Sequence, residues 1–361
     1  MNAAGPPQGV KAPSGGSEPH EVGERGGHIN AAGPPLLSVR DLVTTFRTES
    51  GVFPAVDGVS FDVAPGEALG IVGESGSGKS VTALSILGLL PDPPGRVASG
   101  SIRFDGREMV GLSKNALRDL RGPSIGMIFQ EPMTSLNPVF TVGDQIVETI
   151  RAHEKVSAAA ARARAIELLL RVGIALPERR LGDYPHQLSG GMRQRVMIAI
   201  ALACSPRLLL ADEPTTALDV TIQAQLLDLL RDLQRDTRMA VVIITHNMGV
   251  IAEFADRVLV MYAGRIAEEG PVDAVFTTPR HPYTVGLLGS TPNLERDSPR
   301  LATIAGVLPQ LTDIMPGCRF APRCARRTEI CLREKPPLTD VGAQQRVACF
   351  HWDQPATGER P

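Results

Sequence analysis

The chain has 361 residues, which is long enough for more than one domain and a sizeable buried core. Its 37 lysines and arginines are balanced by 39 aspartates and glutamates, which argues against a nucleic-acid-binding protein, because such proteins usually carry a basic excess. The apolar runs are far shorter than the ~20 residues of a membrane span, and no secretory apolar segment follows Met1. We therefore expect a soluble, cytosolic chain without structural disulfides.

The N-terminal part of the chain changes character at residue 36. Residues 1–35 are rich in Gly, Pro, Ala, Ser and Glu and lack apolar periodicity, which predicts a disordered tail. The apolar residues in 36–46, 59–63 and 101–104 alternate or cluster as they do in strands, so these segments predict a small antiparallel sheet.

A glycine-rich loop follows a predicted buried strand at residues 69–72 and precedes a helix with apolar periodicity. The loop comprises Gly73, Glu74, Ser75, Gly76, Ser77, Gly78, Lys79 and Ser80, and Val81 continues into the helix. This is the G-x-x-x-x-G-K-[ST] pattern in its strand–loop–helix context, which predicts a phosphate-binding loop. Lys79 is expected to reach the β- and γ-phosphates of a nucleotide, and the Ser80 hydroxyl to bind Mg²⁺.

The remainder of the core alternates helices and strands. Residues 145–172 predict a helical region, whose Ala- and Arg-rich part at 157–172 contains neither Pro nor Gly. Strands are expected at 208–211, 240–245 and 258–261, with helices at 221–235 and 248–254 between them. Such alternation predicts a mostly parallel sheet covered by helices, whose ligands bind at the carboxyl ends of the strands.

Polar side chains follow two of these strands. Asp212 and Glu213 end the strand at 208–211, and His246 follows the strand at 240–245. Asp212 is expected to hold Mg²⁺, and Glu213 to orient or deprotonate the attacking water. His246 is expected to hydrogen-bond the γ-phosphate.

A second candidate phosphate cradle lies at Ser189, Gly190 and Gly191, in the string LSGGMRQR that opens another apolar-periodic segment. One nucleotide does not need two glycine-rich cradles from one chain. We therefore expect this segment to serve the nucleotide of a partner subunit.

The chain resembles an ATP-binding cassette ATPase over about residues 36–290. The resemblance is carried by the phosphate loop, LSGGMRQR, ADEP and THN, which occur in this order. The resemblance implies an α/β fold: a P-loop NTPase (RecA-like) core with an antiparallel β subdomain and a helical subdomain at about 135–205. It also implies an ATP-binding head-to-tail dimer, a Mg²⁺ ligand and γ-phosphate sensor at Gln130, and a loop at Asp219 that crosses to the partner. An aromatic residue ahead of the core is expected to stack on adenine, and Phe46 is the choice with Phe53 as its rival. An ordinary core or loop role is the alternative for either residue.

The segments EPMTSLNP, RHPYT and GCRFAPRC resemble the ATPases of oligopeptide and dipeptide importers. This implies a peripheral ATPase on the cytoplasmic face of the membrane. Its partners would be a second ATPase subunit, two transmembrane permeases and an extracytoplasmic solute-binding protein. Nickel or another small solute is the alternative cargo, and a soluble cassette ATPase acting on nucleic acid is the more distant alternative.

Four cysteines lie in a predicted small C-terminal domain at residues 291–361. Cys318, Cys324, Cys331 and Cys349 have the spacing C-x₅-C-x₆-C-x₁₇-C. Zinc sites usually pair cysteines at shorter spacing, so a [4Fe–4S] cluster fits these gaps better, and the family resemblance favours it too. Structural zinc, reduced thiols and a labile disulfide remain alternatives. We expect a structural or regulatory role.

Overall fold

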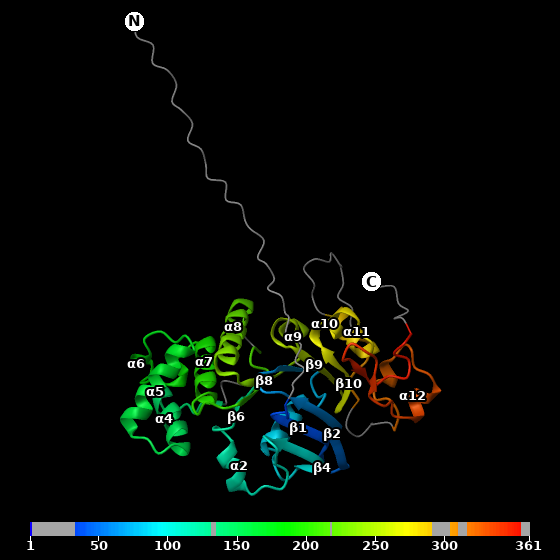
Figure 1. Cartoon of the computed structure of the whole chain (residues 1–361), viewed down its shortest axis with the longest axis horizontal. Helices are drawn as coiled ribbons and strands as arrows, with labels where there is room; N and C mark the ends of the chain where they lie inside the picture. Colours follow the sequence, from blue (N-terminus) through cyan, green and yellow to red (C-terminus); the bar gives the residue numbers. More distant parts are fainter. Residues whose placement is uncertain (2–32, 131–134, 217–218, 291–303, 310–315, 355–361) are drawn as a thin grey trace. The chain divides into compact units, whose positions relative to one another are not determined.

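The computed structural model describes Met1 and residues 33–130, 135–216, 219–290, 304–309 and 316–354. Contacts divide the chain into a short unit, Met1–Ala32, and a long unit, Gly33–Pro361. The predicted disordered tail lies almost wholly outside the described residues. The fold and the candidate site belong to the long unit (Figure 1).

The first sheet is antiparallel and has four strands in the order β2-β1-β4-β5. Its strands are β1 (Leu37–Thr48), β2 (Gly51–Val63), β4 (Gly95–Phe104) and β5 (Arg107–Glu108). The sequence predicts this sheet, but β2 and β4 begin earlier than predicted. Pairing with β1 extends both strands through residues whose own apolar alternation is weak.

The second sheet has eight strands in the order β11-β12-β10-β9-β3-β8-β7-β6. Five neighbouring strands are parallel: β3 (Ala68–Val72), β6 (Ile125–Ile128), β7 (Leu208–Asp212), β8 (Ala240–Thr245) and β9 (Arg257–Tyr262). The sequence predicts four of them, and β6 is the strand that it does not predict. The antiparallel strands β10 (Arg265–Pro271), β11 (Thr339–Asp340) and β12 (Arg346–Val347) extend one edge and were not predicted. Through β11 and β12, residues beyond 291 add to the main sheet.

Most helices connect strands, whereas those between residues 142 and 201 follow one another without a strand between them. They are α1 (Lys79–Leu87), α2 (Lys114–Leu120), α4 (Val142–His153), α5 (Ala158–Arg171), α6 (Pro177–Arg180), α7 (Gly190–Ala201), α8 (Val220–Thr237), α9 (Met248–Phe254), α10 (Val272–Thr277), α11 (Pro282–Gly289) and α12 (Glu329–Arg333), with 3-10 turns η1 (Pro185–Gln187) and η3 (Ala321–Arg323). The prediction that residues 145–172 are helical is confirmed over most of the segment, which forms two helices, α4 and α5, with a break between them. Glu154 is extended, and the Ser157 hydroxyl starts a new helix by accepting the N–H of Ala160.

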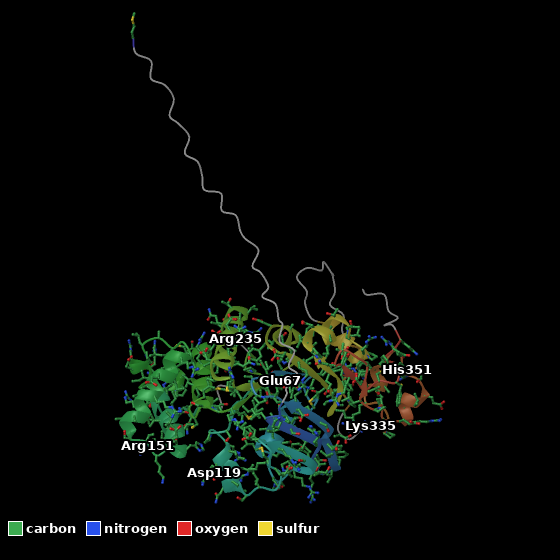
Figure 2. The ribbon with its side chains drawn as sticks, in the orientation of Figure 1. Glu67, Asp119, Arg151, Arg235, Lys335 and His351 are labelled. Carbon is green, nitrogen blue, oxygen red and sulfur yellow. The ribbon has the colours of Figure 1, made fainter. Side chains whose placement is uncertain are left out.

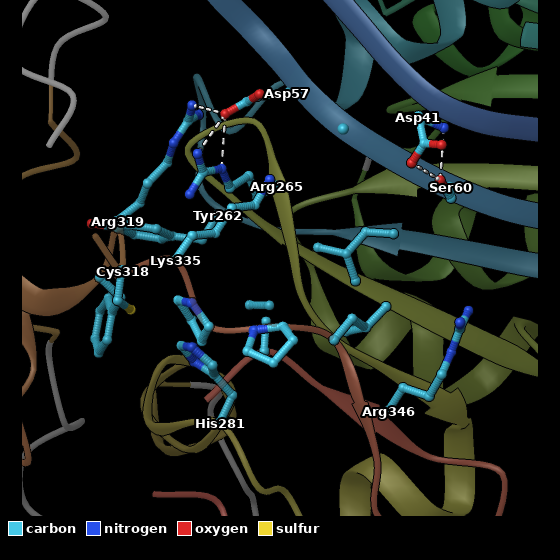
Figure 3. A pocket seen from close by; sticks show the side chains of 18 residues that line it. Asp41, Asp57, Ser60, Tyr262, Arg265, His281, Cys318, Arg319, Lys335 and Arg346 are labelled. Carbon is cyan, nitrogen blue, oxygen red and sulfur yellow. Dashed lines mark hydrogen bonds and ion pairs between the residues drawn. The ribbon is translucent and has the colours of Figure 1, made fainter. Parts of the chain in front are cut away.

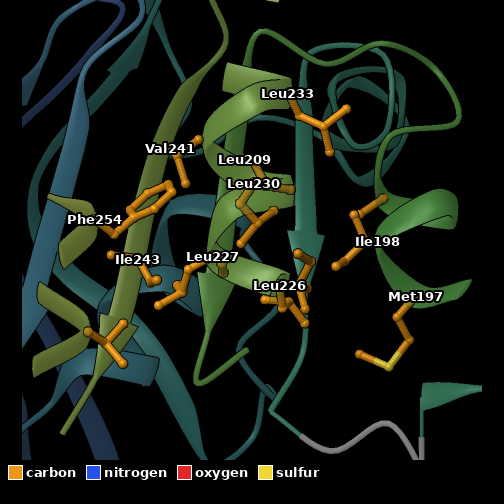
Figure 4. Close-up of a cluster of buried hydrophobic side chains, with 14 of the residues drawn as sticks. Met197, Ile198, Leu209, Leu226, Leu227, Leu230, Leu233, Val241, Ile243 and Phe254 are labelled. Atoms are coloured by element: carbon orange, nitrogen blue, oxygen red, sulfur yellow. The ribbon is translucent and has the colours of Figure 1, made fainter. Parts of the chain in front are cut away.

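The parallel strands separate two hydrophobic cores. In β8, Val241 and Ile243 face the core that α8 and α9 cover, whereas Val242 and Ile244 face the core shared with α1 and the antiparallel sheet. Because side chains alternate along a strand, an unbroken apolar run such as residues 240–244 has both faces covered. Figure 4 shows the first core, where leucines of α8 lie against β7 and β8 (Leu226, Leu227, Leu230 and Leu233).

Charged side chains lie mainly on the outside, as Asp119, Arg151 and Arg235 do in Figure 2. Glu67 is an exception: it is buried and pairs with Arg257 at 2.9 Å. Among the helices of the described ranges, none is long and apolar enough to cross a membrane.

Candidate active site

The glycine-rich loop joins β3 to α1 and keeps the conformation that its glycines allow. Gly76 and Gly78 have φ values of +82° and +98°, which side chains rarely tolerate. A Cβ atom at Gly78 would lie 2.6 Å from the carbonyl oxygen of Ala55. The loop therefore requires glycine at this position for both torsion and space, while Ser75 and Gly76 stay exposed.

Lys79 is buried beneath this loop. Its Nζ donates to the carbonyl oxygens of Gly73 at 2.7 Å and Glu74 at 2.9 Å. Burial lowers the pKa of Lys79, and the charges of Glu213, Asp212 and Glu74 partly oppose that shift. The ammonium group thus lies among the loop carbonyls and close to three carboxylates.

Ser80 and Asp212 place two oxygen atoms together. The Ser80 hydroxyl donates to Asp212 Oδ1 at 3.0 Å. Burial raises the pKa of Asp212, while the hydrogen bond from Ser80 and the charge of Lys79 oppose the rise. Hydroxyl and carboxylate oxygens are ligands that Mg²⁺ accepts, so this pair fits a magnesium site.

Glu213 makes one contact with each of its carboxylate oxygens. Oε1 lies 3.1 Å from His246 Nδ1, and Oε2 accepts a 2.6 Å hydrogen bond from the Thr216 hydroxyl. Burial favours a higher pKa for Glu213, but the hydrogen bonds with Thr216 and His246, together with the charges of His246 and Lys79, outweigh it, so the pKa is lowered. A lowered pKa keeps this carboxylate ionised and able to accept a proton.

The backbone at Glu213 is also strained, with φ at +48°. Strain at a non-glycine residue is often found at functional sites. The Glu213 side chain is 10% exposed, whereas that of His246 is 59% exposed. His246 therefore presents the more open side of the pair to a ligand.

Sheet order brings these residues together. The phosphate loop, His246 and the Asp212–Glu213 pair follow β3, β8 and β7, which are neighbouring parallel strands. Gln130 comes shortly after β6, the next strand, and is exposed. Because these strands end at the same edge, four separate parts of the sequence supply one polar surface. Figure 1 shows β6, β8 and β9 in the middle of the long unit.

The second glycine-rich segment begins helix α7. The Ser189 hydroxyl accepts the N–H of Met192 at 3.3 Å, and Ser189 and Gly190 are exposed. In the described part of the chain, no hydrogen bond or ion pair joins Ser189, Gly190 or Gly191 to the phosphate loop. Ser189 and Gly190 therefore lie at the surface of the described part of the chain.

Two further contacts surround the loop after β7. Asp219 is exposed and caps α8 by accepting the N–H of Ile222 at 2.8 Å. Gln194 in α7 is buried and donates to the carbonyl oxygen of Pro214 at 2.7 Å. The sequence reasoning missed Gln194 and Thr216. Only the position of Thr216, three residues after Glu213, could have suggested its contact.

The two candidate adenine-stacking residues lie opposite each other. Phe46 in β1 is paired with Phe53 in β2, and both are half-buried. Phe46 also packs on Gly95, where a Cβ atom would lie 2.8 Å from its ring. Position alone does not favour one over the other.

The four C-terminal cysteines converge on one small pocket. Cys318, Cys324, Cys331 and Cys349 all line it, and its volume is about 10 Å³. Burial raises the pKa of the Cys318 thiol to about 11, with the other three cysteines adding to the shift. The four thiols agree with an iron–sulfur cluster in kind and number, but the pocket is too small for one without side-chain movement. In the described ranges, no group of three or more His, Cys, Asp or Glu side chains is arranged to hold a metal ion.

A larger cavity of about 360 Å³ lies beside the antiparallel sheet, β10 and the C-terminal region (Figure 3). Asp57 accepts hydrogen bonds there from Arg265 and Arg319. None of the phosphate-loop residues, Asp212, Glu213 or His246 lines this cavity. The candidate nucleotide site is thus separate from this cavity.

Comparison with known proteins agrees with this geometry. Residues 56–216 match the ABC transporter family, and residues 267–331 match the C-terminal region of oligopeptide/dipeptide transporters. The oligopeptide transport ATP-binding protein OppD of Bacillus subtilis strain 168 is 52% identical over 323 residues, covering 89% of this chain and 90% of OppD. AppD of the same organism is 48% identical over 319 residues, covering 88% of this chain and 97% of AppD.

A solved structure shows the same fold. The ATP-binding cassette MJ0796, a dimer bound to ADP and Pi, has 30% identity and a TM-score of 0.59, covering 65% of this chain and 98% of that protein. The fold is therefore that of an ABC ATPase cassette. The chain belongs to the ABC transporter ATP-binding proteins that carry the oligopeptide/dipeptide transporter C-terminal region.

Proposed function

We propose that this chain hydrolyses ATP to power the import of dipeptides or oligopeptides. The observation that carries the proposal is the convergence of the phosphate loop, the Asp212–Glu213 pair and His246 at the ends of three adjacent parallel strands. The names of OppD and AppD, both oligopeptide transport proteins, support the class of cargo.

The phosphate loop and its neighbours would bind MgATP. Backbone N–H groups in Gly73–Ser80 and of Val81, in the first turn of α1, would surround the phosphates, with Lys79 neutralising their charge. Ser80, Asp212 and Gln130 would hold Mg²⁺, Asp212 through water. Mg²⁺ held by these residues would supply positive charge next to the phosphates of the nucleotide.

Glu213 would accept the proton of the attacking water. Its two contacts orient the carboxylate, and the lowered pKa keeps it ionised. His246 would hydrogen-bond the γ-phosphate through its exposed side. This group of residues acts by positioning and charge stabilisation.

The second half of the ATP site would come from a partner. Ser189, Gly190 and Gly191 would cover the partner's nucleotide, and Asp219 would contact the partner subunit. The exposure of Ser189, Gly190 and Asp219 supports this arrangement. A second ATPase subunit, two transmembrane permeases and an extracytoplasmic binding protein complete the proposed importer. The chain would lie on the cytoplasmic face of the membrane.

The four C-terminal thiols would hold a [4Fe–4S] cluster, with zinc as the alternative. Their convergence on one pocket supports the proposal, although the pocket is smaller than a cluster. The test is oxygen-free purification followed by iron, sulfide and zinc analysis. About four irons and four sulfides per chain are expected; one zinc without iron would contradict the cluster.

Transport measurements test the cargo. The chain, assembled with its permeases and binding protein, should take up labelled dipeptides in an ATP-dependent manner. Uptake of nickel without peptide uptake would favour the alternative cargo, which the same ATPase could power.

A further inference from the structure

The C-terminal region contacts the phosphate loop directly. Arg323 donates from Nη1 to Glu74 Oε2 at 2.6 Å and from Nη2 to Glu74 Oε1 at 3.0 Å. The Arg323 side chain is 5% exposed and that of Glu74 is 28% exposed. A paired, two-point contact of this kind fixes both direction and distance, and its burial weakens screening by salt.

Tyr283 and Leu308 also lie against the phosphate loop. The Glu74 N–H donates to the Tyr283 hydroxyl at 2.8 Å. A Cβ atom at Gly76 would lie 3.2 Å from Leu308 Cδ2. The second residue of the loop is thus held by both its backbone and its side chain, and its N–H is directed at Tyr283.

Arg323 is itself held firmly. Its Nε donates to the carbonyl oxygen of Ala305 at 2.9 Å, and its guanidinium lies over the rings of Tyr262 and Phe320 at 5.8 and 6.0 Å. It ends the turn η3, and the next residue, Cys324, lines the four-cysteine pocket. A structural change in that pocket that moves Cys324 would therefore also move Arg323, its neighbour in the chain.

We propose that Arg323 is a positioning residue of the ATPase, through which the four-cysteine region sets the affinity of the phosphate loop for nucleotide. The Glu74 carboxylate lies close enough to the loop to act on the charge of Lys79. Unpaired, this carboxylate would repel the phosphates of ATP, and Arg323 neutralises it. The inference rests on the proposed nucleotide site.

The test measures KM and kcat for ATP in the assembled complex. Arg323→Gln should raise KM about tenfold with little change in kcat, a typical size for coupling between sites. Adding Glu74→Gln to that variant should restore KM, because the repelling charge is removed. Arg323→Lys should keep KM near the wild-type value, and Arg333→Gln, which removes an exposed pair with Glu329, should change neither constant.

The single variant Glu74→Gln predicts a change of KM in a defined direction, and this test does not depend on whether Arg323→Gln folds. It leaves Arg323 positively charged beside the phosphates, so KM should fall. An unchanged KM in Glu74→Gln, or no recovery in the double variant, would overturn the role of Arg323. Failure of the proposed function looks different, since the wild-type complex would then hydrolyse no ATP.

Discussion

Replacing Glu213 by glutamine tests the proposed base with little change of shape. The variant keeps an oxygen and a nitrogen where the two carboxylate oxygens contact His246 and Thr216. It can no longer accept a proton from water. A positioned general base contributes about 10²–10⁴-fold, which corresponds to about 3–5.5 kcal/mol of activation free energy. The structural cost should be smaller, about 1 kcal/mol for one altered buried hydrogen bond.

The assay is phosphate release at saturating MgATP, with nucleotide binding measured separately. Glu213→Gln should bind ATP with a dissociation constant close to that of the wild type, while turnover falls by about 10²–10⁴-fold. Glu334→Gln, which changes an exposed glutamate in the C-terminal region, serves as the matched control and should retain full activity. Near-normal hydrolysis by Glu213→Gln would refute its role as the base.

Three further predictions follow from the geometry. Gly78→Ala should abolish nucleotide binding and lower the free energy of unfolding by about 1–3 kcal/mol, because its Cβ meets the Ala55 carbonyl at a positive φ; intact ATP binding would contradict this. Burial lowers the pKa of His281 to about 3 from 6.5, so the unfolded chain binds a proton that the folded chain excludes. The free energy of unfolding, measured with urea, should therefore fall by about 1.4 kcal/mol per pH unit as the pH drops from 6.5 towards about 3. His281→Asn keeps an acceptor for the Tyr283 N–H and should flatten that slope. Equal slopes in the two proteins would show the reasoning to be mistaken. ATP should drive association of the Glu213→Gln chain with its partner ATPase in gel filtration, and adding Ser189→Arg should prevent it; association despite Ser189→Arg would exclude the proposed cradle.

Local patterns in the sequence predict the parts of the fold that depend on neighbouring residues. The unbroken apolar run at residues 240–244 predicts β8, because a strand buried on both faces needs one. The spacing of the glycines and the lysine likewise predicts the phosphate loop from neighbouring residues alone. Strand order then brings Asp212 and His246 to the same edge.

Contacts between distant segments could not be predicted in this way. Tyr283 and Arg323 reach Glu74 across 209 and 249 residues of sequence, and neither has a local pattern that identifies its partner. The short strands β11 and β12 have only two residues each, too few to show a period. The break at Glu154 was missed because the sequence there contains no Pro or Gly.

Peptide-dependent ATP hydrolysis by the assembled complex is the most direct test of the proposed function. The complex should be reconstituted in vesicles from this chain, its partner ATPase, the permeases and the binding protein, and both phosphate release and labelled dipeptide uptake should be measured. We predict that dipeptide-loaded binding protein stimulates hydrolysis, and that Glu213→Gln abolishes hydrolysis and uptake together. Uptake that continues at the wild-type rate with Glu213→Gln would contradict the proposal that ATP hydrolysis by this chain powers transport.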